Sequence, residues 1–342
     1  REMGIGGIPV TNIENACASA STALHQAYVY LRAGMADVAL AVGAEKLYHY
    51  DKSKSFEVFN GAWDIATVDA SAQALLKMGE GIDAPAGVQT HAQVRSVFMD
   101  IYAALAKHHM KHAGTTARQL AAVAAKNHQH STMNPLSQYQ TSMTIDEVLA
   151  ARMISWPLTL PMCAPISDGS AAALLVREEA LDRFDRSKAI RIDASVLASG
   201  ADRPFDELSQ HVCRQAATRA YEQAGIAPSD ISVAEVHDAT AFAEILQTEN
   251  LGLCEPGQGG WLAERGHSSL GGRIPVNPSG GLESKGHPIG ATGLGQIYEL
   301  VMQLRSEAGK RQVEGAKVAI AENGGGFHGA EEAAACITIL SR

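Results

Sequence analysis

Short runs of apolar residues recur along the chain, separated by longer stretches with helical periodicity. Residues 38–43 form a continuous apolar run, which is typical of a strand covered on both faces. Residues 171–176 have the same character, although so short a run also fits a helix. Residues 190–196 alternate between apolar and polar positions, as a half-buried strand does. Two further strand-like runs lie at residues 232–236 and 317–321.

Amphipathic helices are predicted between these strands. Residues 97–112 and 117–130 have helical spacing, and Asn134-Pro135 ends the second stretch. Residues 213–225 predict another helix, with Gly225 as its terminator. Alternation of strands and helices along the whole chain predicts an α/β protein.

The chain is long enough for two domain-sized cores. A polar stretch at residues 183–188 precedes the strand at 190–196, so we place a boundary there, between an N-terminal half (1–185) and a C-terminal half (186–342). Because the chain starts at Arg1 and chemistry-bearing residues follow at once, we expect the N-terminal half to be incomplete as given.

Composition and charge exclude several functional classes. The chain has 46% hydrophobic residues and a formal net charge of −9, which argues against nonspecific nucleic-acid binding. No apolar run has the length of a membrane span, and no signal peptide is visible, so we expect no membrane association and a cytoplasmic protein. Five cysteines without metal-ligand spacing predict neither a disulfide framework nor a metal site.

Cys17 is the first candidate for chemistry. Small residues surround it, and a helical pattern through Leu24 and Leu31 follows directly. A thiol at the start of a helix lies near unpaired backbone N–H groups and the positive end of the helix dipole, which lower its pKa. The alternative is an inert buried cysteine, since free cysteine is among the most buried residue types.

His287 is the second candidate. It lies in a glycine-rich segment, residues 277–293, just before another predicted helix. Histidine is the usual activator of a cysteine nucleophile, and glycines permit the close backbone approach that an active site needs. The alternative is a loop histidine that caps the following helix or contacts water.

Two predicted strands deliver polar residues at their ends. His237-Asp238 follows the run at 232–236, and Glu322-Asn323-Gly324 follows the run at 317–321. Open α/β sheets usually hold their ligand chemistry at such strand ends. For Asp238 we favour a helix N-cap over a reactive acid.

Other prominent residues are expected to be structural. The histidines at 108, 109 and 112 have no nearby acidic ligand, so we interpret them as a solvated helix face or an oligomer contact. The remaining cysteines lie in apolar surroundings and are predicted to be part of the core: Cys163, Cys213, Cys254 and Cys336.

Taken together, four segments in this order resemble the thiolase superfamily over nearly the whole chain. They are VTNIENACAS at residues 10–19, AVGAE at 41–45, CAPISDGSAAA at 163–173 and GHPIGATG at 286–293. The resemblance implies a thiolase fold: two duplicated α/β halves with helices layered on mixed five-stranded sheets. It also implies a loop domain, at about residues 46–160, that covers the active site.

The resemblance assigns roles to these residues. Cys17 matches the nucleophile that takes up the acyl group, and His287 matches the histidine that deprotonates it. His237 matches a polar residue of the first oxyanion hole. This position is histidine in sterol-carrier-protein-x-like thiolases, so the chain is closer to that group. Gly324 N–H, together with Cys17 N–H, matches the second oxyanion hole. No coenzyme A-contacting residue can be assigned.

The chain departs from the family where a second acid/base cysteine is expected. In common thiolases it lies in a CxGGG motif, where this chain has Glu322. In sterol-carrier-protein-x-like thiolases it lies in an HDCF motif, where this chain has Ala239. Either Glu322 is the acid/base, with a pKa raised in a water-poor pocket, or the chemistry is altered. A third alternative is that Glu322 only holds the glycine loop.

The implied function is cleavage of a β-ketoacyl-CoA, or the reverse Claisen condensation, through an acyl-Cys17 intermediate. Coenzyme A is then a substrate, and no cofactor is bound permanently. The alternatives are an acyltransferase or retro-aldolase of the same fold, and a noncatalytic structural subunit. The resemblance also implies a homodimer or tetramer. A small zinc-ribbon/OB-fold partner subunit is a further expectation, as in a benzoylsuccinyl-CoA thiolase-type complex.

Overall fold

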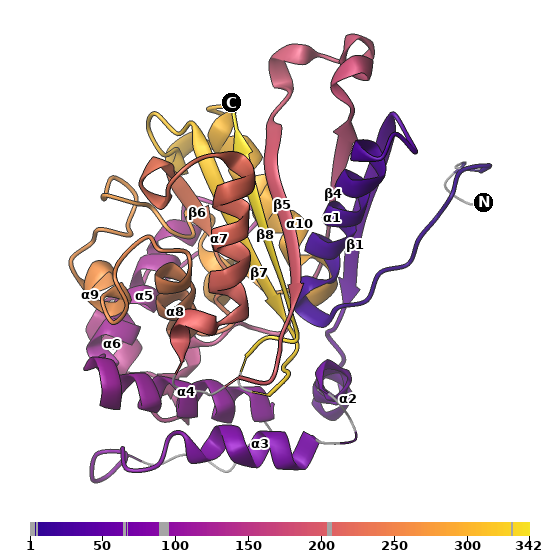
Figure 1. Cartoon of the computed structure of the whole chain (residues 1–342). Helices are drawn as coiled ribbons and strands as arrows, with labels where there is room; N and C mark the ends of the chain where they lie inside the picture. Colours follow the sequence, from indigo (N-terminus) through magenta and orange to yellow (C-terminus); the bar gives the residue numbers. More distant parts are fainter. Residues whose placement is uncertain are drawn as a thin grey trace.

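The computed structural model describes residue 4 and residues 6–63, 66, 68–88, 96–203, 207–329 and 331–342. Strands and helices alternate, as the sequence predicts for an α/β protein (Figure 1). The strands are β1 Val38–Lys46, β2 Met153–Ser155, β3 Leu158–Thr159, β4 Asp168–Val176, β5 Arg191–Ser199, β6 Val233–Glu235, β7 Val318–Gly325 and β8 Ala334–Ser341. The helices are α1 Ser19–Arg32, α2 Lys52–Glu57, α3 Val68–Lys77, α4 Val97–Ala113, α5 Ala117–Ser131, α6 Ile145–Ala150, α7 Val212–Ala224, α8 Ala241–Asn250, α9 Gly259–Glu264 and α10 Thr292–Leu304.

The C-terminal strands form a mixed sheet in the order β5-β8-β7-β6. β8 is antiparallel to both β5 and β7, whereas β6 is parallel to β7. The mixed character confirms the expectation, but within the described residues this sheet has four strands rather than five. Beyond β6 the next segment makes only a single bridge, Ala234 to Val276, so it does not form a fifth strand.

β1 and β4 pair antiparallel along nine residues each, from Val38 opposite Val176 to Lys46 opposite Asp168. Ala41 and Leu175 face inward and pack with α1 and α10. The opposite face is open: Leu40, Val42 and Leu174 are each more than half exposed. Within the single chain the apolar run at 38–43 is therefore covered on one face only, whereas the sequence predicts cover on both. Apolar residues on an uncovered face give the same sequence pattern.

Alternation along β7 divides the core into two layers. Ile320 belongs to the cluster that α7 forms with the sheet, whereas Ala319 and Ala321 belong to the cluster that contains α1 and α10. Side chains of successive strand residues point to opposite faces, so Glu322 lies on the α7 face and Asn323 on the α1 face. This alternation determines which side chains can meet at the end of β7.

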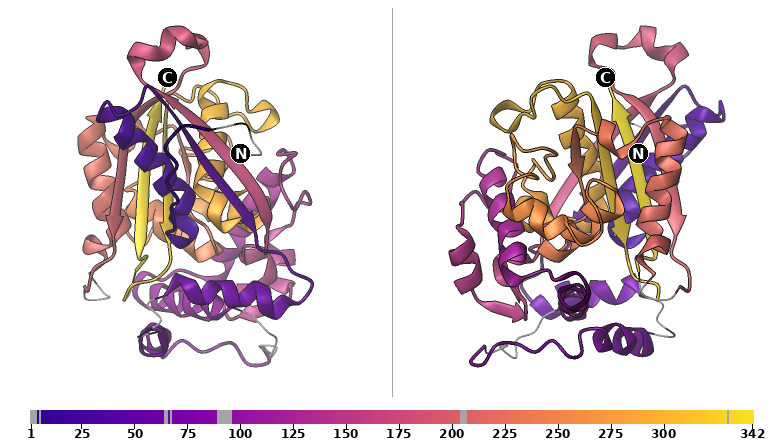
Figure 2. Two further views of the ribbon diagram at one scale, coloured as in Figure 1. Left: turned by 90° about the vertical axis from the view of Figure 1, so that its right-hand side faces the viewer. Right: turned by 60° about the vertical axis from the view of Figure 1, so that its left-hand side comes forward.

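Helices α3 and α4 lie across the lower end of the sheet in the orientation of Figure 1, and the rotated views agree (Figure 2). Side chains of this segment pack on the loop after β7: Trp63 stacks on Phe327 with ring centroids 5.5 Å apart, and Tyr102 meets Phe327 edge-on at 5.7 Å. The segment between β1 and β4 therefore closes over the end of β7.

The predicted helix boundaries are largely confirmed. α4 begins after the N-cap Ser96 and ends at Gly114, which has a left-handed backbone with φ 76°. α7 ends at Gly225 with φ 69°, as its sequence predicts. The proposed boundary between the halves, at residues 185 and 186, falls in the connection between β4 and β5. Among the described residues, every helix is too short or too polar to cross a membrane.

Candidate active site

Cys17 lies in a single 3₁₀ turn, Ala16–Ala18, directly before α1. The turn is tight: Ala16 has a left-handed backbone with φ 48°, and Ala18 N donates to Asn15 O at 3.0 Å. Gly325 packs against this turn, and a side chain there would collide with Asn15 O and Ala18 N. The end of β7 therefore fixes the thiol at the start of the helix, where the sequence predicts it.

His287 reaches Cys17 from the opposite end of the chain. Its Nε2 lies 3.3 Å from Cys17 Sγ, and its Nδ1 lies 2.7 Å from Thr292 Oγ1. Because the Thr292 hydroxyl donates its proton to Pro288 O, it must accept one from His287 Nδ1. That tautomer leaves the lone pair of Nε2 facing the thiol. The backbone N–H of His287 also donates to Ser167 Oγ, which fixes the loop.

The resting site is a neutral thiol beside a neutral imidazole. Burial raises the pKa of Cys17 to about 12, although the backbone N–H groups of Cys17 and Gly326 lower it in part. Burial, and then the neighbouring His237 and Lys285, hold the pKa of His287 well below its usual range. The N–H at the helix start lowers the pKa of the thiol, as the sequence predicts, but desolvation outweighs this effect and the net pKa is raised. The thiol loses its proton only to a base in contact.

His237 follows β6 and lies with His287 at the same cavity, their ring centroids 5.1 Å apart. Both ring nitrogens of His237 are buried and have no hydrogen-bond partner among the described residues. Burial lowers its pKa to about 4, so the ring is neutral at physiological pH. A neutral imidazole carries one N–H, and here that donor is left for a ligand atom. The arrangement suits the carbonyl oxygen of a thioester.

Asp238 is not the N-cap of the helix that follows it, contrary to the prediction. α8 begins at Ala241, and its N-cap is Thr240. The Asp238 carboxylate is fully buried and accepts from Leu282 N at 2.8 Å and from the side chain of Asn127 at 3.2 Å. It holds the turn that leads to the His287 loop, a tertiary contact that local sequence does not reveal.

Glu322 is close to the site but does not face the cavity. Its carboxylate is fully buried on the α7 side of β7, where it accepts from His237 N at 2.9 Å and from Cys213 Sγ at 3.5 Å. Burial and, next, the neighbouring Glu332 raise the pKa of Glu322 to about 8. Glu322 therefore braces the backbone that carries His237.

Substitution of Glu322 by Gln should make stability less dependent on pH. The folded-state pKa of this carboxyl lies above its ordinary value of 4.5, so the wild type loses stability as pH rises from about 4.5 towards 8. Gln cannot ionise and carries no such loss. Thermal unfolding followed from pH 5 to pH 9 should show the Tm of Glu322→Gln rising relative to wild type. A Tm difference that stays constant over this range would contradict the assignment.

Gly324 is not positioned as the family pattern implies. It stays within β7, opposite Ala335, and its α-carbon faces the Glu332 side chain. Gly326, two residues further on, places its N–H at Cys17 Sγ, and Gly325 and Gly326 both line the cavity. The N–H groups that converge on the sulfur are thus those of Cys17 and Gly326.

Sequence reasoning missed Glu332. It lies in the connection between β7 and β8 and lines the same cavity as Cys17, His237 and His287. The adjacent acids Glu331-Glu332, directly before the apolar strand β8, were the available signal. Cys213, predicted to be ordinary core, lies on α7 where its thiol contacts Glu322. The cavity at the predicted site is therefore lined by a carboxyl group that was not predicted, that of Glu332.

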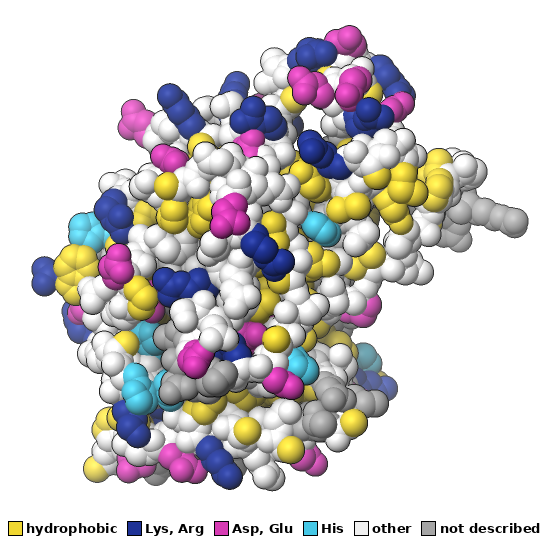
Figure 3. Space-filling view, in the orientation of Figure 1, with side chains coloured by type: hydrophobic (Ala, Val, Ile, Leu, Met, Phe, Trp, Pro, Cys, Tyr) yellow, Lys and Arg dark blue, Asp and Glu magenta, His cyan; other side chains and the backbone are white. Residues whose placement is uncertain are grey.

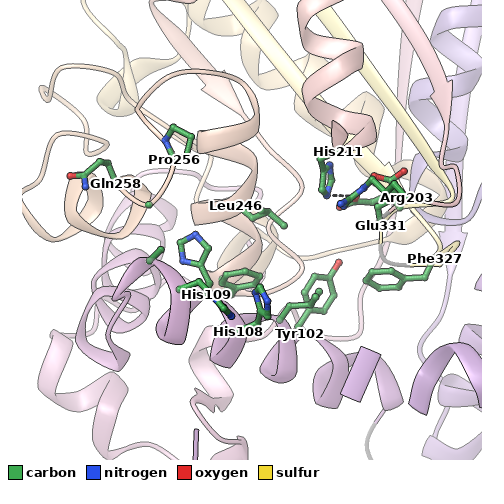
Figure 4. A pocket seen from close by; sticks show the side chains of 16 residues that line it. Tyr102, His108, His109, Arg203, His211, Leu246, Pro256, Gln258, Phe327 and Glu331 are labelled. Carbon is green, nitrogen blue, oxygen red and sulfur yellow. Dashed lines mark hydrogen bonds and ion pairs between the residues drawn. The ribbon is translucent and has the colours of Figure 1, made fainter. Parts of the chain in front are cut away.

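Two neighbouring cavities share part of their lining near Glu332. One, of about 710 Å³, holds Cys17, His237 and His287. A second, of about 360 Å³, lies between α4 and α8 and shares Tyr102, Phe327 and Glu332 with the first (Figure 4). Its apolar wall consists of Leu105, Phe242 and Leu246 together with the shared aromatic residues. Both volumes are in the range of small-molecule sites.

Of the three histidines on α4, His112 is exposed as predicted, whereas His109 differs from the prediction. His109 is buried, with Nδ1 2.7 Å from Thr115 Oγ1 and Nε2 3.2 Å from Glu249 Oε2, so it does not belong to a solvated face. The rings of His108 and His112 are in contact, tilted, with centroids 4.2 Å apart, and both residues line the second cavity.

Acidic and basic side chains are interspersed on the face shown in Figure 3, so charge alone marks no phosphate-binding patch there.

The fold and the site define a class of protein: a mixed-sheet α/β protein in which a cysteine thiol at the start of a helix is in contact with a histidine ring. Family models agree. "Thiolase, N-terminal domain" matches residues 1–147, and "Thiolase C-terminal domain-like" matches residues 201–342. The chain belongs to the thiolase family.

Three curated relatives illustrate the similarity. Acetyl-CoA acetyltransferase of Methanothermobacter thermautotrophicus is 38% identical over 99% of this chain and 82% of its own length. Benzoylsuccinyl-CoA thiolase subunit BbsB of Thauera aromatica is 34% identical over 92% of this chain and 76% of its own length. Sterol carrier protein 2 of Oryctolagus cuniculus is 40% identical over 94% of this chain, which spans only 57% of that protein. The expected closeness to sterol-carrier-protein-x-like thiolases is confirmed.

Among solved structures, the Ltp2-ChsH2(DUF35) aldolase has a TM-score of 0.72 with 23% identity, covering 95% of this chain and 78% of the other. At that identity the similarity establishes the thiolase fold alone. It also shows that this fold occurs in a protein described as an aldolase.

Proposed function

We propose that the protein is a coenzyme A-dependent thiolase, which cleaves a β-ketoacyl-CoA, or forms one in reverse, through an acyl-Cys17 intermediate. One observation carries the proposal: the lone pair of His287 Nε2 faces Cys17 Sγ at 3.3 Å, and Thr292 fixes the tautomer. A nucleophile in contact with an oriented base is the arrangement that covalent catalysis requires.

In the first half-reaction Cys17 Sγ attacks the keto carbon while its proton moves to His287 Nε2. The oxyanion formed at the keto carbon accepts from the N–H groups of Cys17 and Gly326, in place of Gly324. His237 and His287 hold the thioester oxygen, where negative charge collects as the carbon–carbon bond breaks. Each such donor lowers the barrier by roughly 3 kcal/mol. Free coenzyme A then removes the acyl group from Cys17.

A retro-aldolase is the second candidate, because the Ltp2-ChsH2 neighbour has this fold. The two reactions differ in what they require. Thiolysis consumes free coenzyme A and passes through an acyl-enzyme, whereas retro-aldol cleavage releases a carbonyl compound without either. Product analysis on matched β-ketoacyl-CoA and β-hydroxyacyl-CoA substrates, with and without coenzyme A, tests the proposal. Cleavage that ignores coenzyme A would contradict it, and inertness towards all substrates would favour a structural subunit.

The second cavity is the proposed site for a bulky acyl group. Its apolar wall adjoins the Cys17 cavity at Tyr102 and Phe327, so a group attached to the keto carbon can extend into it. Leu246 is buried in this wall.

Substitution of Leu246 by Trp should fill the second cavity. We expect kcat/KM for a bulky β-ketoacyl-CoA to fall roughly tenfold or more, with little change for acetoacetyl-CoA. Steady-state kinetics on both substrates measures the effect, and Leu136→Trp, at an exposed position, is the control. Equal losses on both substrates would place the acyl group elsewhere.

Assembly is also part of the proposal. The exposed apolar row Leu40, Val42 and Leu174 on the β1–β4 face supports packing against a second copy in a homodimer or tetramer. One relative is named as a subunit, and the aldolase neighbour is a two-component structure, which supports a small zinc-ribbon/OB-fold partner. Light scattering of the protein alone and with a candidate partner distinguishes these states.

A further inference from the structure

Cleavage of the carbon–carbon bond leaves a carbanion that needs a proton. Neither of the two family positions for the second cysteine supplies one here, because Ala239 has no titratable group and Glu322 faces away from the cavity. The group must line the cavity that holds Cys17, be able to carry a proton, and play no part in the deprotonation of Cys17. Glu332 meets these conditions in the part of the chain that the structure describes.

Glu332 is held in place but is not saturated. Gln247 Nε2 donates to its Oε1 at 2.7 Å. Its Oε2 lies 3.3 Å from His211 Nε2 but has no well-aligned hydrogen bond among the described residues, although it is buried. Gly324 makes room for the side chain, since a Cβ there would collide with Glu332. One carboxyl oxygen is therefore fixed by Gln247, and the other is buried without an aligned hydrogen bond, on a residue that lines the cavity.

A metal ion is the competing explanation, because His211, Cys213 and Glu332 offer ligand atoms within 4.8 Å of one another. The tautomer of His211 argues against it. Its Nδ1 accepts from Cys213 N at 3.2 Å, as the N-cap of α7, so the ring proton must lie on Nε2. A ring nitrogen that carries a proton has no lone pair for a metal ion, so Nε2 is not a metal ligand in this tautomer. The cluster suits a proton carrier better than an ion.

We propose that Glu332 is the second acid/base group of the thiolase reaction, in place of the missing cysteine. This inference rests on the proposed function. As the bond between C2 and C3 breaks, its electron pair stays on C2, and the Glu332 carboxyl gives its proton to that carbon. In the second half-reaction the Glu332 carboxylate takes the proton of the coenzyme A thiol, and the sulfur attacks the acyl carbon. Cys17 leaves as a thiolate and recovers its proton from His287. His287 is then neutral again and Glu332 is protonated again, as at the start.

The groups around Glu332 are consistent with this role. His211 and Cys213 from α7, Glu322 from β7 and Tyr102 from α4 lie near it, and the Arg203–Glu331 ion pair flanks it. Burial and the adjacent Glu331 raise the pKa of Glu332 to about 7, against the influence of Cys213 and Arg203. A general acid/base works best with a pKa near the operating pH.

The test compares Glu332→Gln with Glu322→Gln. For Glu332→Gln we expect acylation of Cys17 by an activated thioester, whose leaving group needs no proton, to survive, while cleavage and exchange of the α-protons of acyl-CoA in D₂O each fall by about 10²- to 10⁴-fold. Wild-type exchange should decline as pH drops below about 7, because the base becomes protonated. Glu322→Gln should retain most of the exchange. The exposed Glu314→Gln is the matched control.

The outcomes separate this inference from the proposed function. No acylation in the wild type would overturn the thiolase assignment itself. Acylation together with undiminished exchange in Glu332→Gln would overturn only the role of Glu332, and a selective loss in Glu322→Gln would transfer the role to that residue. A stoichiometric metal ion in the purified protein that is lost in Glu332→Gln would also overturn the acid/base role of Glu332. If Glu332→Gln does not fold, Glu332→Ala with added formate gives a second reading: exchange restored by formate supports a carboxylate base, and no restoration in folded protein contradicts it.

Discussion

Cys17→Ser should abolish both acyl-enzyme formation and carbon–carbon cleavage, with a loss of on the order of 10⁴-fold or more in kcat. The serine hydroxyl has nearly the same size and keeps the 3₁₀ turn, but it is far less acidic than a thiol and is a weaker nucleophile towards the keto carbon. The side chain also loses the polarisable sulfur that the N–H groups of Cys17 and Gly326 surround. Steady-state thiolysis and mass spectrometry of the trapped enzyme measure the effect.

Cys254→Ser is the matched control, because that cysteine is half-buried and outside the residues that line the Cys17 cavity. It should leave turnover unchanged. If Cys17→Ser kept an acyl adduct on another residue, or retained cleavage within tenfold of wild type, then Cys17 would not be the nucleophile and a retro-aldol mechanism would gain support.

Substitution of His287 by Gln should lower acylation of Cys17 by about 10²- to 10⁴-fold at pH 7. The thiol pKa is raised to about 12, so without its base Cys17 stays protonated at neutral pH. The sign of the pH dependence follows: the acylation rate of the variant should climb steadily as pH rises from 7 to 10, because a growing fraction of the thiol ionises. The wild type should change far less over this range, since its base is already neutral.

Rates of acylation by a reactive acyl-CoA, measured across this pH range, provide the data. His267→Gln is a control, because that ring packs on Trp261, away from the cavity. A His287 variant with a pH profile parallel to that of wild type would mean that another group deprotonates the thiol.

Local pattern was enough to predict much of the fold. Continuous apolar runs located β1, β4 and β7, and glycines with left-handed backbones ended α4 and α7 where the sequence indicates. These features depend on neighbours in sequence. The pairing of Cys17 with His287 spans 270 positions, so it was expected from the resemblance to the thiolase family and not from local pattern.

Features that depend on distant contacts were not predictable. The exposed face of β1 depends on what packs over it, which the apolar run does not encode. The high thiol pKa of Cys17 comes from burial by segments far away in the chain, and this outweighs the local helix dipole. Glu332 enters the site only because the β7–β8 connection folds back over Gly324. The family pattern pointed to Glu322, but β7 directs that side chain towards α7.

The central claim is that Cys17 carries an acyl group during turnover. Intact-protein mass spectrometry after mixing with a panel of acyl-CoA and β-ketoacyl-CoA compounds tests it most directly. We expect a mass increase equal to one acyl group, located on Cys17, missing in Cys17→Ser and discharged by free coenzyme A. Cleavage of a substrate with no adduct at any time, in wild type and in the slowed Glu332→Gln variant alike, would contradict the acyl-enzyme mechanism.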